Sequence, residues 1–333
     1  MPCKYLQRLT GLTLVVSLSF NACRTPVENR PNSKYFSDIN SIQADGTGHK
    51  ILAVGSFANV VLTTSSIFFI KDYSTLFSIN YDGSNLTPLY QSLIWFDCNL
   101  AANGTKLLLT SRSSNSPLGA NNLYLMNSDG SNLQQLTLTM GEFGLAQISP
   151  SLDEILFERK SGIAIANSDG SNVQFIRSQT DTSGAGSPRY LDENHILYYE
   201  INHNNGSESA RLFDKTNHTD KLIVAHSGLS SPYTGKVLQG DSLLCLNGDF
   251  ATIFVYTSDT LIEVARGYDA TFSADGKKIV YHDLTHIFLQ NIDGTNIQLV
   301  YTEQDQNKTV ELPQLSPDGK FIIFQTLYSV PTN

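Results

Sequence analysis

Leu123-Tyr-Leu-Met-Asn-Ser-Asp-Gly-Ser-Asn-Leu-Gln-Gln-Leu-Thr137 is the stretch whose pattern recurs along the chain and decides its fold. A short apolar strand at 123–126 leads into a polar turn at 127–132, and a second strand leaves the turn at Leu133. Asp-Gly between two strands is typical of a tight hairpin, because Asp can hydrogen-bond its own backbone and Gly130 can take a positive φ without a Cβ clash. The stretch therefore predicts a β-hairpin.

Further copies of this hairpin lie at 76–89, 163–176 and 287–300, with a weaker one at 39–52. A second hairpin signature, Ser-Pro-Asp-Gly-Lys or a relative of it, lies between the copies at 100–109, 148–157, 272–281 and 315–324. Two hairpins make one antiparallel unit of four strands, A to D, with the roughly 40 to 50 residues of a propeller blade. Repetition at this spacing therefore predicts an array of such blades.

The two turn sequences resemble those of the TolB-type propeller repeat. In that family Ser-Pro-Asp-Gly-Lys, as at 316–320, marks the A–B turn, and Asp-Gly-Ser-Asn, as at 129–132, marks the C–D turn. The resemblance covers nearly the whole chain after residue 37 and implies an all-β propeller. These motifs are specific to the fold and not to an activity. TolB also carries an N-terminal α/β domain that we do not expect here, so the resemblance does not transfer TolB's role.

The order of the hairpins predicts how the ring closes. The first C–D hairpin precedes the first A–B hairpin, and the last A–B hairpin has no C–D hairpin after it. One blade must then combine strands A and B at 311–324 with strands C and D at 39–52. We expect a single propeller domain at 38–330 with seven blades, while six or eight remain open, because the units near Lys215 and Ser258 lack the Asp-Gly turn. The hairpins that support this count are centred near residues 45, 82, 129, 169, 215, 258 and 293 for C–D and near 64, 103, 152, 193, 240, 275 and 318 for A–B.

Composition fits a well-buried β protein. Hydrophobic residues make up 41% of the chain and charged residues 16%, and no long segment has helical periodicity, so we expect almost no helix. The formal net charge is −9 and Lys and Arg form no cluster, which argues against nucleic acid as a partner.

The N-terminus reads as an export signal at 1–22, with Lys4 and Arg8 before an apolar run. It looks like a bacterial lipoprotein signal in which Cys23 becomes the lipidated first residue, although Phe20 stands where the usual lipobox has Leu. A simple cleaved signal is the alternative. Residues 23–37 are expected to form a flexible tether. We therefore expect an exported monomer in the bacterial cell envelope, held by its lipid on the outer membrane and facing the periplasm or the cell surface.

No residue pattern indicates a catalytic centre, a metal site or a cofactor. Cys98 and Cys245 lie in strands three blades apart, too far for a disulfide, and are expected to be buried. The histidines, expected in loops or at the surface, lack the spacing of a zinc site. The Asp-Gly turns lack the spaced carboxylates of a calcium loop. No Gly-x-Ser-x-Gly elbow occurs. Propeller lyases that act on acidic sugars place a metal with His and Gln over the channel, and no such set can be recognised.

The stereotyped A–B and C–D turns share one face of a propeller, and the more variable B–C and D–A loops share the other. Recognition usually resides in loops on a rigid scaffold, so this loop face is the predicted binding face. We expect a scaffold that binds an envelope protein or peptide more than we expect an enzyme. The alternatives are a lyase-like or glycan-binding propeller, and channel-lining packing as the role of the candidate residues. The candidate binding residues, near the start of the inner strands, are Trp95, Phe143, Arg189, Tyr233, Tyr268 and Glu311.

Overall fold

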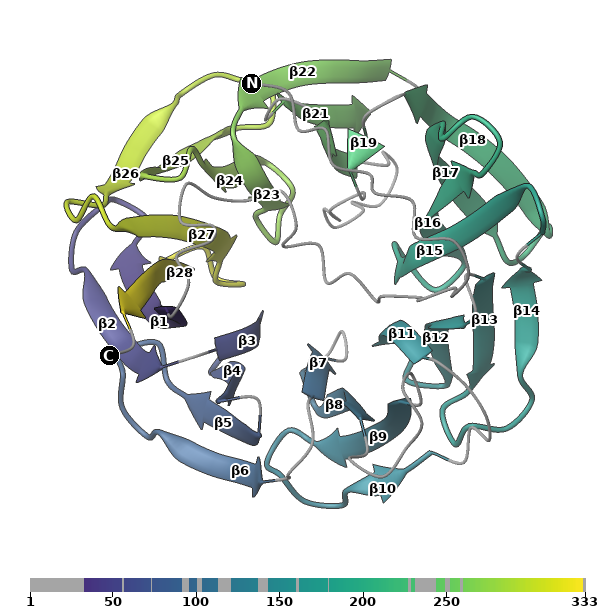
Figure 1. Ribbon diagram of the computed structural model, residues 1–333, viewed down its shortest axis with the longest axis horizontal. Helices are drawn as coiled ribbons and strands as arrows, with labels where there is room; N and C mark the ends of the chain where they lie inside the picture. Colours follow the sequence, from purple (N-terminus) through teal and green to yellow (C-terminus); the bar gives the residue numbers. More distant parts are fainter. Residues whose placement is uncertain are drawn as a thin grey trace.

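The computed structural model of the protein is a ring of β-sheets around a central axis (Figure 1). The described residues form strands and turns, and none of them builds a helix that is long and apolar enough to cross a membrane. The predicted signal at 1–22 and Cys23 lie outside the described residues. The structure describes residues 33–331 except 56, 73, 92–95, 101–103, 113–120, 137–142, 160–161, 179, 227–228, 231–243, 249–251 and 258–259.

The described strands form seven four-stranded sheets, numbered here as blades 1 to 7. Blade 1 contains β3 (Phe57–Leu62), β4 (Ile67–Lys71), β5 (Thr75–Ile79) and β6 (Thr87–Gln91). Blade 2 contains β7 (Phe96–Leu100), β8 (Lys106–Arg112), β9 (Asn121–Asn127) and β10 (Gln134–Gln135). Blade 3 contains β11 (Phe143–Ile148), β12 (Glu154–Arg159), β13 (Gly162–Asn167) and β14 (Gln174–Arg177). Blade 4 contains β15 (Ser183–Tyr190), β16 (His195–Asn202), β17 (Glu208–Asp214) and β18 (Thr219–His226).

Blade 5 contains β19 (Leu229–Ser230), β20 (Leu244–Gly248), β21 (Thr252–Thr257) and β22 (Thr260–Arg266). Blade 6 contains β23 (Tyr268–Phe272), β24 (Lys278–His282), β25 (His286–Asn291) and β26 (Gln298–Thr302). Blade 7 contains β27 (Lys308–Leu315), β28 (Phe321–Pro331), β1 (Ser33–Gln43) and β2 (Lys50–Gly55). The predicted all-β propeller with four-stranded antiparallel blades is thus confirmed. In each blade strand A is the one nearest the axis and strand D lies at the rim (Figure 1).

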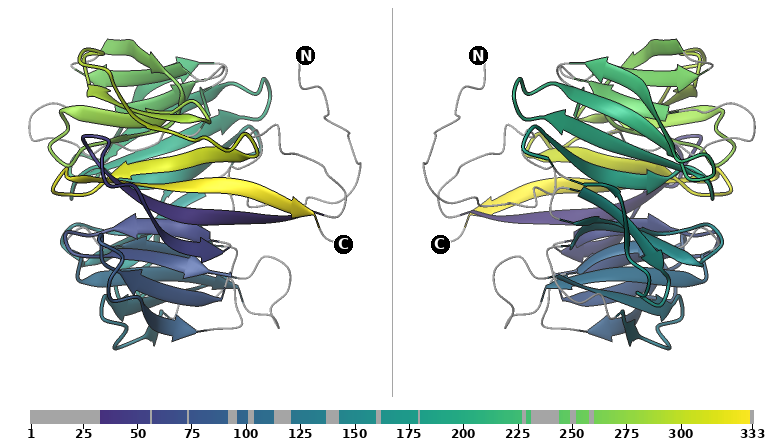
Figure 2. Two further views of the ribbon diagram at one scale, coloured as in Figure 1. Left: turned by 90° about the vertical axis from the view of Figure 1, so that its left-hand side faces the viewer. Right: turned by 90° about the vertical axis from the view of Figure 1, so that its right-hand side faces the viewer.

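Blade 7 is built from both ends of the described chain. β1 pairs with β28 along its whole length, from Ser33 opposite Pro331 to Gln43 opposite Phe321. The ordered sheet therefore begins before the predicted boundary at residue 38, because the last predicted tether residues find backbone partners in β28. Beyond Ser37 and Tyr328, the β1–β28 pair has no further strand on either side and projects from the ring as a two-stranded ribbon (Figure 2).

The repeated turn sequence is explained by its hydrogen bonds. In the C–D turn of blade 2, Gly130 has φ 87 and its N–H donates to Asn127 O at 3.0 Å. Asp129 Oδ1 accepts from Ser131 N at 2.9 Å and from Ser131 Oγ at 2.6 Å. The Ser131 hydroxyl, more than any other contact, holds the pKa of Asp129 below its usual value. Asn132, with φ 54, lies between the turn and β10. Asp129, Gly130, Ser131 and Asn132 thus each have a conformational role.

The turn glycines also join neighbouring blades. Each D strand except β10 shows a bulge that leaves one apolar residue out of register, for example Leu52 in β2 and Leu89 in β6. A Cβ on Gly83 would meet Leu52 Cδ2 at 3.5 Å, and one on Gly130 would meet Leu89 O at 3.2 Å. The C–D turn of one blade therefore sits on the bulge of the blade before it.

The hydrophobic core lies between blades. The B strands are sandwiched on both faces, and in β12 Ile155, Leu156 and Phe157 are fully buried. Ile155 and Phe157 pack toward blade 2 with Leu108 and Leu123, whereas Leu156 packs toward blade 4. Alternate side chains of one strand thus serve two blade interfaces, which explains why the B strands are continuous apolar runs.

Candidate binding site at the mouth of the channel

The structure does not gather the six predicted binding residues into one patch. Trp95 and Tyr233 lie outside the described residues, and Phe143 begins β11 with a side chain that is likewise not described. Arg189 lies near the far end of β15, beside the A–B turn and away from the loop face. Tyr268 and Glu311 lie in neighbouring inner strands, β23 and β27.

A β-bulge interrupts five of the described inner strands. In three of these strands a bulged residue other than glycine has φ 50, namely Ser187, Asp269 and Leu312. Such a conformation costs on the order of 1 to 3 kcal/mol and persists where the surroundings fix it. Bulges also bend strands and are common near functional sites. The inner strands are therefore held in a strained conformation beside the channel.

Asp269 and His282 form a buried pair behind two of these bulges. His282 is 0% exposed and its Nε2 lies 3.1 Å from Asp269 Oδ2. Because Leu284 N donates to His282 Nδ1 at 3.1 Å, the ring proton belongs on Nε2, which donates to the carboxylate. Asp269 Oδ2 also accepts from Leu312 N at 3.2 Å. The prediction that the histidines lie in loops or at the surface is wrong for His282, whose burial Asp269 compensates.

The turn that follows His282 is strained as well. Leu284 has φ 86, an unfavourable conformation for a bulky side chain. Its carbonyl accepts from Val310 N at 2.6 Å, and Thr285 O accepts from Glu303 N at 2.8 Å. The B–C turn of blade 6 is thereby fastened to the start of blade 7, so the loop face is rigid at this interface.

These contacts fix the backbone on which Tyr268 and Glu311 are carried. Tyr268 is half-buried, and its ring centroid lies 5.7 Å from that of His282. Glu311 stands between two residues whose N–H groups are bound to blade 6, Val310 and Leu312. Its side chain is buried at 6% exposure. Tyr268 is therefore the predicted residue that can present a surface at the channel mouth, while Glu311 belongs to the inner packing.

The ribbon adds a second group of side chains on the loop face. Lys308 Nζ lies 4.4 Å from the centre of the Tyr328 ring and 3.2 Å from Asp38 Oδ2. Tyr328 Oη donates to Asp38 Oδ1 at 3.0 Å, and Phe36 stacks on Tyr328 with ring centroids 5.8 Å apart. Desolvation, aided by the Asp38 carboxylate, raises the pKa of Tyr328. An ordered aromatic pair with one cation thus stands at the base of the ribbon.

A half-buried carboxyl lies on the opposite side of the ring. Glu158 of β12 accepts from Ser187 N, the bulge of the next blade, at 3.3 Å, and a Cβ on Gly186 would lie 3.2 Å from Glu158 Oε1. Burial raises the pKa of Glu158. Glu158 in blade 3 and His282 in blade 6 lie the same number of residues after the A–B turn, as does Gln325 in blade 7. This position faces the next blade and is polar in all three blades.

The residues of this mouth that were not predicted from the sequence are Asp269, His282, Leu284, Lys308 and Tyr328. A usable signal was the histidine that closes an apolar B strand, because an unpaired polar group there would be costly. Within the described residues no group of three or more His, Cys, Asp or Glu side chains could hold a metal ion. Since neither Asp269 nor His282 reaches solvent, this pair braces two blades and does not present an acid or base to a ligand.

No protein-family model matches the chain, and no curated protein is significantly similar to it in sequence. Several solved structures share its architecture. An oligogalacturonate lyase in complex with manganese has a TM-score of 0.59 at 13% identity, over 84% of this chain and 79% of that one. An oligogalacturonate lyase from Vibrio parahaemolyticus has a TM-score of 0.59 at 10% identity, over 83% of this chain and 80% of that one.

A putative TolB from Agrobacterium tumefaciens has a TM-score of 0.53 at 13% identity, over 90% of this chain and 99% of that one. At such low identity these similarities establish an architecture and no activity. The chain therefore has a TolB-like propeller fold.

Proposed function

We propose that the protein is a lipid-anchored β-propeller of the bacterial cell envelope that binds a protein or peptide on its loop face. The observation that carries this proposal is the rigid channel mouth at blades 6 and 7. There three strained residues, Asp269, Leu284 and Leu312, are each held by hydrogen bonds across or along the blades. Strain of this kind is typical of surfaces prepared for a ligand.

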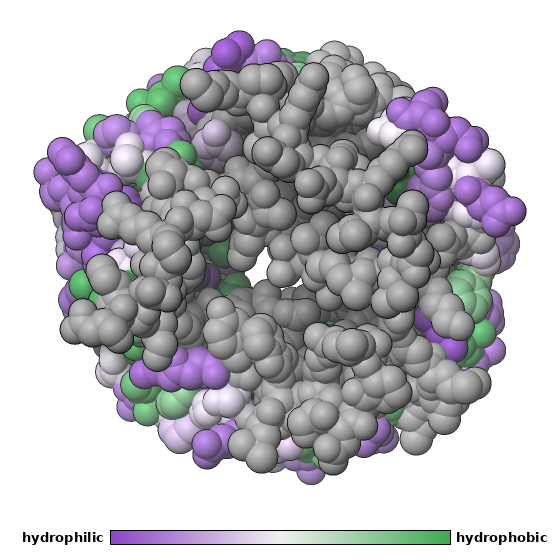
Figure 3. Space-filling model, in the orientation of Figure 1, coloured by the Kyte–Doolittle hydropathy of each residue, from purple (hydrophilic) through white to green (hydrophobic). Residues whose placement is uncertain are grey.

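The half-buried side chains at this mouth suit a protein surface. Tyr268 and the Phe36, Tyr328 and Lys308 group supply aromatic rings and a cation on ordered strands. Rigid aromatic residues give large contact areas at low entropic cost and are frequent in protein interfaces. Outside this face, Figure 3 shows hydrophilic and hydrophobic side chains interspersed around the rim.

The lipid anchor rests on the sequence. Lys4, Arg8 and the apolar run that ends at Phe20 precede Cys23 at the spacing of a lipoprotein signal. Two or more acyl chains would give stable membrane attachment. Mass spectrometry of the purified full chain tests this point. A diacylglyceryl adduct on Cys23 that is lost in Cys23→Ser supports it, and an unmodified N-terminus at any residue contradicts it.

Binding is tested by placing a photo-cross-linking amino acid at Tyr268 or at Tyr328 in cells that produce the full chain. The control position is Lys320 in an A–B turn, whose side chain is 74% exposed on the opposite face. We expect one discrete adduct from Tyr268 and Tyr328 and none from Lys320. Adducts from Lys320 alone, or from none of the three positions, would reject the loop face as the binding face.

The carbohydrate-active alternative is tested in parallel. The full chain is incubated with oligogalacturonate and manganese, and the absorbance of unsaturated products is followed. Product release would replace the scaffold proposal with an elimination reaction. No release, together with loop-face adducts, favours the scaffold.

A further inference from the structure

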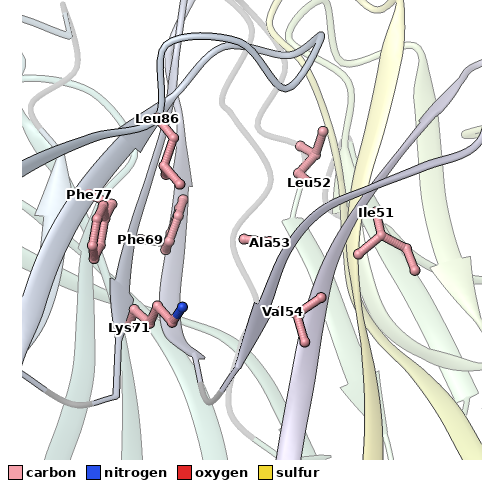
Figure 4. A pocket seen from close by; sticks show the side chains of 8 residues that line it. All are labelled: Ile51, Leu52, Ala53, Val54, Phe69, Lys71, Phe77 and Leu86. Carbon is pink, nitrogen blue, oxygen red and sulfur yellow. The ribbon is translucent and has the colours of Figure 1, made fainter.

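A hollow lies at the rim of the ring, where blade 7 meets blade 1. It is a groove of about 350 Å³ between β2 on one side and β4 and β5 on the other. Figure 4 shows the two walls, with the amine of Lys71 directed into the space between them. We call this feature the rim groove, and its lining residues are Ile51, Leu52, Ala53, Val54, Phe69, Lys71, Phe77 and Leu86.

The groove lies beside a repeated position that is small in β2. This position is the residue that follows the bulge in a D strand. This residue is Tyr90 in β6 and Tyr301 in β26, where the rings pack against the following blade. The ring of Tyr301, for example, lies 4.7 Å from that of Phe324. In β2 the same position is Ala53, and the space that a tyrosine fills in β6 and β26 is left open. It is also alanine in β22, where Ala265 packs against blade 6.

The second feature of the rim groove is a cation without a partner. Lys71 and Glu200 occupy equivalent positions, because each lies the same number of residues after the A–B turn of its blade, blade 1 for Lys71 and blade 4 for Glu200. Between blades 3 and 4, Glu200 forms an ion pair with Arg177. Arg177 occupies the position in its D strand that Ala53 occupies in β2. Between blades 7 and 1 the corresponding pair is Ala53 and Lys71, and no described residue forms an ion pair with Lys71. The rim groove thus lacks a bulky side chain at the position of Ala53 and a carboxylate paired with Lys71.

We propose that the rim groove binds an extended segment of a partner protein. In this segment an aromatic or branched apolar side chain lies in the space beside Ala53, and a neighbouring Asp or Glu pairs with Lys71. This site is separate from the loop face proposed above.

The outer strand favours an extended segment over a small molecule. β2 is the last strand of its sheet, so its outer edge has backbone N–H and C=O groups that no described strand pairs. An edge of this kind can accept an added strand, and pockets for alternate side chains then give specificity. Ile51 and Val54 on this strand are 53% and 56% exposed, and Leu86 across the groove is 52% exposed. Covering them removes apolar surface from water.

The test uses a displayed library of random twelve-residue peptides, selected on the immobilised full-length protein. We expect enrichment of sequences with an acidic residue beside an aromatic or branched apolar one. A synthetic peptide of the enriched sequence is then titrated against variants. Lys71→Gln should weaken binding about tenfold, the factor that corresponds to 1.4 kcal/mol. Ala53→Tyr should abolish it by filling the groove.

A control separates this site from other effects. Lys320→Gln removes an exposed lysine elsewhere and should leave peptide binding unchanged. Thermal unfolding checks that Ala53→Tyr remains folded, as expected from tyrosines at this position in blades 1 and 6. If Ala53→Tyr does not fold, Lys71→Gln alone decides. Failure to enrich acidic and apolar peptides, or binding indifferent to Lys71→Gln and Ala53→Tyr, would overturn the proposal. Laurate, a fatty acid, is titrated against the same variants. If laurate binds, if Lys71→Gln weakens its binding, and if no peptide is enriched, the proposal is overturned in favour of a lipid.

Discussion

Gly130→Ala tests whether the turn glycine serves the blade interface as well as the turn itself. Gly130 has φ 87, and an added Cβ would lie 3.2 Å from Leu89 O and 3.3 Å from Leu89 Cβ. Gly319 provides a matched control, because its φ is 71 and a Cβ there would meet nothing within 4 Å. Both substitutions disturb an Asp-Gly turn with the same left-handed backbone, and they differ in the neighbouring blade.

The expected magnitudes follow from these two contributions. Placing alanine in the left-handed region costs about 1 to 2 kcal/mol, and this penalty applies to both variants. Crowding a packed contact costs about a further 1 to 3 kcal/mol. For Gly130 the nearest atoms are backbone and Cβ atoms of a bulged strand, which cannot rotate away. We therefore expect Gly319→Ala to lose about 1 to 2 kcal/mol and Gly130→Ala about 1 to 3 kcal/mol more than that.

The assay is urea unfolding of the full-length variants, followed by circular dichroism in the far ultraviolet. The quantity compared is the free energy of unfolding of each variant relative to the unchanged protein. A second control, Gly206→Ala, lies in a B–C turn with φ 68 and open space around it, and it should behave like Gly319→Ala. If Gly130→Ala and Gly319→Ala were equally destabilising, the glycine would be needed for its φ alone, and the inferred role of the bulge contact would be refuted.

Three further outcomes are expected. Asp269→Ala should lower the free energy of unfolding by about 3 kcal/mol, because it leaves buried His282 without its acceptor; urea unfolding checks this, and a loss below 1 kcal/mol would contradict it. Asp129 has a lowered pKa in the folded state, so its contribution to stability is present above the unfolded pKa of about 3.9 and is lost as pH falls through the lower folded value. Asp129→Asn should therefore reduce the steepness of acid unfolding, and an unchanged pH profile would argue against this. Arg177→Met should cost about 1 kcal/mol, less at high salt, since it removes the main partner of Glu200; a loss that does not vary with salt would exclude an electrostatic cause.

The sequence predicted local structure best where one residue decides a conformation. The Asp-Gly turns were recognisable because Gly130 must take a positive φ and Asp129 must accept from the residues after it. The start of the ordered sheet was predicted late, at residue 38. Ser33 to Ser37 have no strand pattern of their own, and they extend β1 because β28 offers backbone partners. Long-range pairing of this kind leaves no local signal.

The candidate site was harder to predict because it depends on contacts between blades. Tyr268 was identified as an aromatic residue at the start of an inner strand. The pairing of Asp269 with His282 could not be foreseen, since the bulge in β23 changes which residue faces which neighbour. A one-residue change of register moves a side chain to the other face of a sheet. Periodicity therefore finds the strands but not the bulges, and the bulges determine which side chains meet.

A chain made of repeats supplies its own comparison set, which replaces an alignment of related sequences. A polar residue at a position that faces another blade requires a local reason. One such position is apolar in blade 1, where Ile70 packs against blade 2, whereas in blade 6 it is His282 in a buried pair, in blade 3 the half-buried Glu158 and in blade 7 Gln325. The position after the D-strand bulge is tyrosine in two blades and alanine in two others, at Ala53 and Ala265, and beside Ala53 a space is left open. Because stability constrains the repeat equally in every blade, departures from it are the places where selection for something other than folding can act. The rim groove and the channel mouth both lie at such departures, and both involve blade 7, which joins the two ends of the propeller.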